Sequence, residues 1–169
     1  MGDQLQRIVV ASLFLVATGQ PPSMAAPNFH LYCNTGYNES DCKLQLRRLG
    51  DVLAKMDLTE LGDWSWILVR SQDWRPILRR VGRDPDSPAF TILEKRQTFL
   101  EEAVFNSDPV RSRTLLEKWR IPLDQFPKYA VVHELGHALC READEQRARV
   151  YAVELQKTGR VTCRGRNDP

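Results

Sequence analysis

The sequence predicts an α+β domain in which a small mixed sheet packs on helices. Three observations lead to this expectation. An apolar stripe at helical spacing comes first, over residues 41–56. Short segments rich in aromatic and β-branched residues follow between residues 64 and 105. Two further helical patterns then occupy about residues 130–140 and 145–155. A helix, a few strands and then two helices is an order typical of α+β domains.

Residues 1–25 are expected to be a secretory signal peptide. A weakly positive start with Arg7 precedes an apolar run over residues 8–18, which is too short to span a bilayer. Small residues, Ser23 and Ala25, occupy the −3 and −1 positions of a cleavage site after Ala25. An uncleaved N-terminal anchor is the alternative.

Residues 26–169 are then expected to form a single domain with a mobile C-terminal tail from about residue 164. The formal net charge of the chain is +2, and its basic clusters alternate with acids, so no nucleic-acid partner is expected. No later segment is apolar enough for stable membrane insertion after signal cleavage. The predicted location is therefore secreted or periplasmic, and the sequence leaves the oligomeric state unknown.

The first half of the domain is predicted to alternate between helix and strand. Residues 41–56 form the first helix, because apolar side chains recur at i, i+4 and i+7. Residues 64–70 read as a buried strand by their aromatic and β-branched content. Residues 71–81 are expected to be helical, with Pro76 in an early turn.

The second half is predicted to begin with a turn. Residues 82–88 contain Gly, Pro and Asp, which predict a turn. Residues 89–95 and 98–105 are the next strand candidates, although residues 101–103 would also tolerate helix. A helix over residues 109–120 follows an Asn-Ser-Asp-Pro start, and Asp124 is expected to cap the helix after it.

An HExxH motif lies inside an apolar run near the end of the chain. On a helix, His133 and His137 are one turn apart on the same face, so both imidazoles can reach one Zn²⁺. Glu134 points about 100° round the helix, which suits a general base better than a ligand. The residues around these three carry no charge, and the chain has only three histidines. These features favour a zinc site over an amphipathic core helix.

A catalytic zinc site needs a third protein ligand and an open position. No further histidine follows the motif, so the ligand is expected among the acids that do. The candidates are Glu142, Asp144, Glu145 and Glu154. Apolar residues at helical spacing predict a second helix here, with Asp144 as its N-cap.

The second helical pattern carries a resemblance to a known family. The residues of this pattern are Glu145, Ala148, Tyr151, Ala152 and Leu155. This string resembles the ExxAxx[FY]AxxL signature of gluzincin metallopeptidases of the ImmA/IrrE type, and the resemblance covers residues 128–156. In that family the leading glutamate is the third zinc ligand, so the resemblance implies this role for Glu145.

The resemblance implies a zincin-like domain and an exported zinc metallopeptidase. Zn²⁺ would be held by the two histidines and Glu145, with Glu134 as general base. Such enzymes also use a group that stabilises the oxyanion, and Tyr151 and Tyr129 are the candidates. A peptide or protein substrate would add as a strand to an edge strand of the sheet, formed by one of the two candidate strands between residues 89 and 105.

A function of another class is a secreted binding or inhibitory domain that keeps a structural or vestigial zinc site. The intact Glu134 argues against it, because a structural site needs no base and prefers four protein ligands.

The four cysteines add a constraint if the chain is exported. An even count in an exported protein indicates two disulfides, with three possible connectivities. We expect Cys33–Cys42 to attach a short N-terminal loop to the first helix. Cys140–Cys163 would join the end of the HExxH helix to the chain beyond the Glu145 helix.

Overall fold

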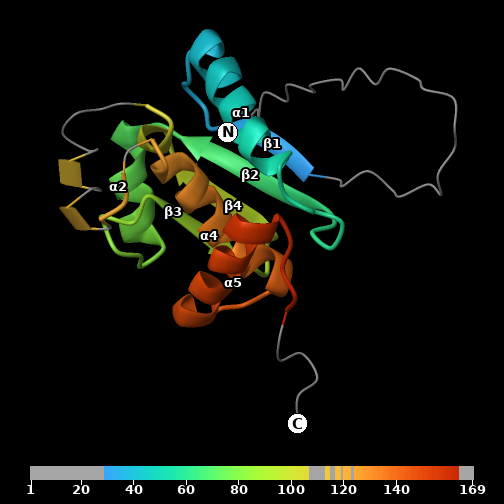
Figure 1. Ribbon diagram of the computed structural model, residues 1–169. Helices are drawn as coiled ribbons and strands as arrows, with labels where there is room; N and C mark the ends of the chain where they lie inside the picture. The colour runs from blue at the N-terminus through green and yellow to red at the C-terminus, as the bar shows by residue number, and fades with distance from the viewer. Residues whose placement is uncertain (1–28, 107–112, 115–116, 119, 123, 164–169) are drawn as a thin grey trace, which may run out of the picture.

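The computed structural model describes residues 29–106, 113–114, 117–118, 120–122 and 124–163 (Figure 1). Within these residues, a small mixed sheet packs on helices, which confirms the predicted α+β class. The expected signal peptide, the tail from residue 164 and most of the helix predicted over residues 109–120 lie outside the described residues.

The sheet has four strands in the order β1-β2-β4-β3. They are β1 (Phe29–Cys33), β2 (Trp64–Val69), β4 (Gln97–Glu101) and β3 (Ala89–Ile92). The pairs β1–β2 and β2–β4 are parallel, whereas β3 is antiparallel to β4. The edges of the sheet are therefore β1 and β3, and β4 is an interior strand.

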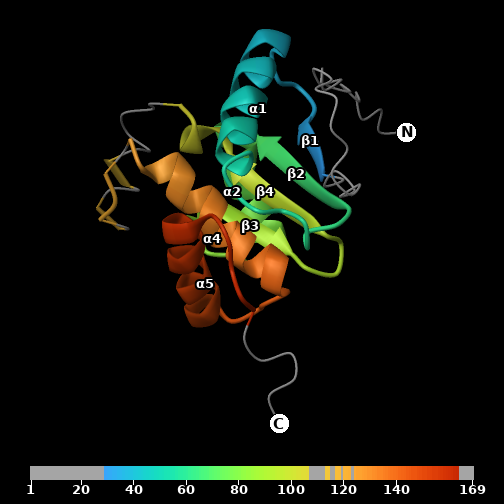
Figure 2. The same cartoon turned by 45° about the vertical axis from the view of Figure 1, so that its right-hand side comes forward.

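Among the described residues, the sheet packs against the helices α1 (Glu39–Leu53), α2 (Ser71–Arg80), α4 (Phe126–Cys140) and α5 (Glu145–Thr158). The helices α1, α4 and α5 share one core with alternate residues of the strands, among them the fully buried Trp64, Trp66 and Leu68. The helix α2 packs on the other side of the sheet, where Trp74 contacts Phe90 with ring centroids 5.5 Å apart. Figures 1 and 2 show α4 lying across the sheet, with α5 beside it.

The helices begin and end close to their predicted limits. The helix predicted over residues 41–56 begins two residues earlier, because Asn38 caps it by accepting a hydrogen bond from the Ser40 backbone N–H at 2.9 Å. The helix predicted over residues 71–81 is α2, and Pro76 lies inside it.

One loop prediction and two strand predictions need correction. The expected N-terminal loop that carries Cys33 is strand β1, which pairs with β2. The strand predicted over residues 89–95 ends at Ile92, before a turn in which Arg96 has a φ of 54°. The strand predicted over residues 98–105 ends at Glu101, because the short 3-10 helix η1 (Glu102–Val104) follows it.

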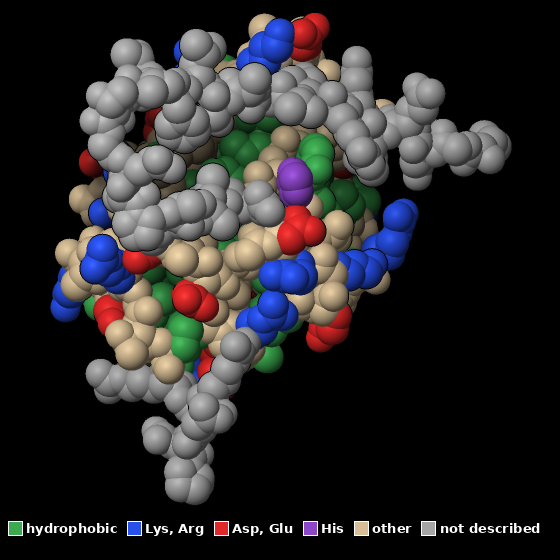
Figure 3. All heavy atoms as spheres, turned by 90° about the vertical axis from the view of Figure 1, so that its right-hand side faces the viewer, with side chains coloured by type: hydrophobic (Ala, Val, Ile, Leu, Met, Phe, Trp, Pro, Cys, Tyr) green, Lys and Arg blue, Asp and Glu red, His purple; other side chains and the backbone are tan. Residues whose placement is uncertain are grey.

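Both expected disulfides are present, Cys33–Cys42 and Cys140–Cys163. They suggest an oxidising, extracellular environment. No helix among the described residues is long and apolar enough to cross a membrane. On the face shown in Figure 3, Lys and Arg side chains lie beside Asp and Glu side chains.

Candidate metal centre

The HExxH motif lies on α4, which is buried almost throughout. Pro127 occupies its first turn, where a missing N–H costs nothing. The expected cap, Asp124, is wrong: Gln125 is the N-cap residue and makes no side-chain capping bond. The helix ends at Cys140. Arg141 follows with a left-handed φ of 48°, which lets the Glu142 backbone N–H donate a hydrogen bond back to the His137 carbonyl at 3.0 Å. The chain then turns within a few residues into α5.

The helices α4 and α5 approach each other closely at Gly136. A Cβ at this position would lie 2.5 Å from the backbone oxygen of Ala148, so only glycine allows the observed contact. Asp144 caps α5 by accepting a hydrogen bond from the Arg147 backbone N–H at 2.9 Å, which confirms its predicted role. Glu145, the first residue of α5, is thereby placed beside the histidines of α4.

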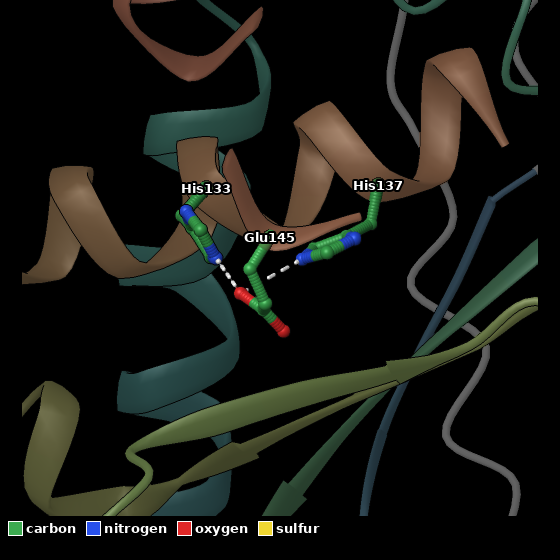
Figure 4. Close-up of side chains that lie close together, drawn as sticks. All are labelled: His133, His137 and Glu145. Carbon is green, nitrogen blue, oxygen red and sulfur yellow. Dashed lines mark hydrogen bonds and ion pairs between the residues drawn. The ribbon is translucent and has the colours of Figure 1, made fainter. Parts of the chain in front are cut away.

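Three side chains point toward one another in Figure 4: His133 and His137 from α4, and Glu145 from the start of α5. Glu145 Oε2 lies 3.1 Å from His133 Nε2 and 3.5 Å from His137 Nε2. One ligand atom from each residue lies within 4.8 Å of the others, so the group could hold a metal ion. The histidines are almost buried, whereas the Glu145 side chain is 67% exposed. The site is therefore built into the core on one side and open to solvent on the other.

The other acids proposed as third ligands have different partners. Asp144 caps α5, as described above. The Glu142 carboxylate accepts a hydrogen bond from the Asp144 backbone N–H at 2.9 Å. The Glu154 carboxylate accepts one from the Thr162 backbone N–H at 3.1 Å. Of the four candidates, Glu145 is the one that the structure brings to the histidines.

The surroundings orient the two imidazoles differently. His137 Nδ1 lies 2.6 Å from the Glu142 backbone oxygen, which accepts a hydrogen bond from the Nδ1–H and leaves Nε2 to bind a metal. His133 Nδ1 is buried and has no hydrogen-bond partner among the described residues. The His133 ring instead stacks on Tyr129, with centroids 6.2 Å apart.

The acidic and imidazole groups shift one another's pKa values. Hydrogen bonds from His133 and His137 hold the pKa of Glu145 well below its usual range. Burial by itself lowers the pKa of His137, but the hydrogen bond with Glu145 and the charge of Glu134 outweigh burial, so this pKa is raised. Glu145 therefore stays ionised beside the imidazoles, and its negative charge favours a bound cation.

Glu134 lies beside the group without joining it. Its side chain is 5% exposed, and its Oε2 accepts a hydrogen bond from Thr91 Oγ1 at 2.8 Å. Burial raises the pKa of Glu134, and the two histidines and Thr91 offset part of this effect. A carboxyl group whose pKa is raised above its usual value is suited to accept and return a proton.

A cavity of about 480 Å³ opens in front of these residues. Its walls include the two histidines, Glu134 and Glu145 on one side and the edge strand β3 on the other. Tyr129 also lines the cavity. Tyr151 is 4% exposed on α5 and does not belong to the cavity lining, so Tyr129 is the tyrosine that the structure places near the group.

Comparison of the chain with protein-family models, with curated proteins and with solved structures found no match.

Proposed function

We propose that the protein is an exported, zinc-dependent metallopeptidase of the gluzincin type. The observation that carries this proposal is the convergence of His133, His137 and Glu145, with Glu134 held beside them in one cavity. The HExxH spacing and the resemblance over residues 128–156 point in the same direction.

The donor set fits zinc. Zinc accepts imidazole nitrogen and carboxylate oxygen at about 2.0–2.2 Å, so neighbouring ligand atoms of a tetrahedral site lie about 3.4 Å apart. The measured separations from Glu145 Oε2 to His133 Nε2 and His137 Nε2 are 3.1 and 3.5 Å. Three protein ligands leave one position open, as in catalytic rather than structural zinc sites. A zinc ion bound here would polarise a scissile carbonyl and lower the pKa of water.

Glu134 acts as the general base in this proposal. It takes a proton from the attacking water and later delivers it to the leaving amine. Burial of Glu134 supports both steps, because a raised pKa lowers the free-energy cost of protonating the carboxylate. Tyr129 replaces Tyr151 as the preferred donor to the oxyanion, because Tyr129 lines the cavity.

The position of strand β3 supports the proposal that the substrate is a peptide. This strand is an edge strand, and its residues Ala89–Ile92 line the cavity opposite the metal centre. The unpaired edge of such a strand can bind an extended peptide backbone as an additional strand. Of the two strands considered from the sequence, β4 is unsuited to this role because it lies between β2 and β3.

The experiment compares the wild type with Glu134→Gln, each purified with zinc. We expect about one zinc per chain in both proteins, because Glu134 is not a ligand. Cleavage of a peptide library should fall by about 10²–10⁴-fold in the variant, the usual worth of general base catalysis. Equal cleavage by both proteins would assign the activity to another site. A zinc-loaded wild type with no chelator-sensitive cleavage would instead support the binding domain.

A further inference from the structure

Behind Glu134, a row of hydrogen-bonded side chains extends into the core. The indole Nε1–H of Trp64 donates to Thr98 Oγ1 at 3.0 Å. Thr98 Oγ1 lies 2.9 Å from Thr91 Oγ1, which donates to Glu134 Oε2 at 2.8 Å. All four residues are at most 7% exposed. The row therefore connects β2, β4 and β3 with the HExxH helix.

The two threonines stand out against the apolar residues around them. Thr91 and Thr98 are directly opposite each other in the β3–β4 register. Other residues that face α4 from these strands are apolar, including Ala89 and Leu100. A buried hydroxyl destabilises the fold unless it is hydrogen-bonded, and valine would fill the same space without this cost. The hydroxyls therefore call for an explanation beyond packing.

The chemistry of the two ends fixes the direction of every hydrogen bond in the row. An indole nitrogen can only donate a hydrogen bond. Glu134 must be ionised to accept a proton as general base, and an ionised carboxylate can only accept hydrogen bonds. Thr91 must therefore donate a hydrogen bond to Glu134, so that Thr98 must donate one to Thr91. Thr98 in turn accepts from Trp64. No hydroxyl proton in the row is left without an acceptor.

We propose that Thr91 and Thr98 are positioning residues that hold Glu134 with Oε1 as the oxygen that exchanges protons. The proposal rests on the metallopeptidase function above. Because Thr91 occupies Oε2, the proton from the attacking water forms its new bond to Oε1 as the O–H bond of the water breaks. The same proton leaves Oε1 for the amine nitrogen as the peptide C–N bond breaks. The protons of Thr91 and Thr98 stay on their own oxygens throughout.

The test uses variants that remove one hydroxyl and keep the volume. Thr91→Val and Thr98→Val interrupt the row, whereas Thr91→Ser retains the hydroxyl. We expect Thr91→Val to lower kcat by about tenfold to a hundredfold, within the range of general base catalysis, with KM unchanged. Zinc content should equal that of the wild type. Thr91→Ser should recover most of the lost kcat.

A double variant separates positioning from a general structural effect. If Thr91 acts through Glu134, Thr91→Val should cause little further loss of kcat in a Glu134→Gln background. At the far end of the row, Trp64→Phe should also lower kcat. Trp66→Phe is the matched control, because Trp66 is equally buried and its Nε1 has no partner among the described residues.

A second measurement requires no activity. The indole N–H resonance of Trp64, assigned by its loss in Trp64→Phe, can be followed by NMR in the metal-free protein. We expect Thr91→Val to shift this resonance and to speed its hydrogen exchange, and Thr91→Ser to restore both.

The outcomes distinguish the two proposals. A zinc-loaded wild type that cleaves no peptide overturns the proposed function and the positioning role together. An active wild type whose kcat is matched by Thr91→Val overturns the positioning role alone. The positioning role also fails if Thr91→Val and Thr91→Ser lose equal activity, or if Thr91→Val is fully additive with Glu134→Gln.

Discussion

Gly136 offers a sharp test of how the fold builds the metal centre. In Gly136→Ala, the new Cβ would lie 2.5 Å from the Ala148 backbone oxygen and 3.4 Å from the Ala152 nitrogen. The contact with oxygen must open by about 0.9 Å to reach an ordinary van der Waals distance of 3.4 Å. Backbone on both sides leaves no flexible side chain to yield, so α4 and α5 must separate.

The expected loss of stability follows from two opposing effects. Overpacking of this kind destabilises by about 1–3 kcal/mol, and the backbone clash places Gly136→Ala near the upper end. Alanine is a better helix former than glycine by about 1 kcal/mol, which offsets part of the loss. We therefore expect a net loss of about 2 kcal/mol, or about 4–8 °C in Tm for a domain of this size.

Metal binding should weaken as well. Glu145 moves with α5, whereas His133 and His137 stay on α4, and a metal site tolerates misplacement of only about 0.5 Å. We expect zinc affinity to fall by about tenfold to a hundredfold.

The assay combines thermal unfolding of the metal-free protein with zinc titration against a competing chelator. Gly50→Ala is the matched control. Gly50 also lies inside a helix, but its Cβ would meet only the Leu31 Cδ1 atom at 3.9 Å. This variant should be at least as stable as the wild type, with unchanged zinc affinity. If Gly136→Ala matches Gly50→Ala in both measurements, the close approach of the two helices does not determine the site.

Three further predictions concern the disulfide, the third ligand and export. Replacing Cys140 and Cys163 by serine should lower the free energy of unfolding by about 3 kcal/mol in denaturant titrations, because the bridge closes a loop with a sequence separation of 23; an unchanged midpoint would contradict this. Glu145→Ala should lose most bound zinc in metal analysis, whereas Asp144→Ala should keep it despite losing about 1 kcal/mol of capping; the reverse result would reject Glu145 as ligand. The intact mass of the secreted protein should begin at Ala26, and recovery of only the full-length chain would argue against processing.

The sequence alone was sufficient for features that depend on local periodicity. The apolar stripe with Leu46, Leu49 and Leu53 predicted α1, because one face of a helix repeats every 3.6 residues. The same period placed His133 and His137 on one face of α4. Local capping chemistry predicted Asp144 as the N-cap of α5.

Features that depend on partners distant in sequence were harder to predict. The strand β1 escaped detection because its side chains are mostly half-buried and its register is set by pairing with β2. Asp124 was expected to cap α4, but the helix begins at Phe126 and Gln125 is its N-cap residue. The start of α4 is set by tertiary packing of its apolar surface rather than by a capping side chain.

The metal centre shows the same division. Composition and spacing singled out two histidines as candidate ligands and Glu134 as a candidate base. Four acids remained as candidates for the third ligand on the residues alone, and the choice of Glu145 came from a family resemblance. The backbone contact at Gly136 decides which of these acids reaches the histidines, because it sets the distance between α4 and α5. Thr91 carried no signal in the sequence, since a threonine in a strand is ordinary. Only the pairing of β3 with β4 beneath α4 places its hydroxyl on Glu134.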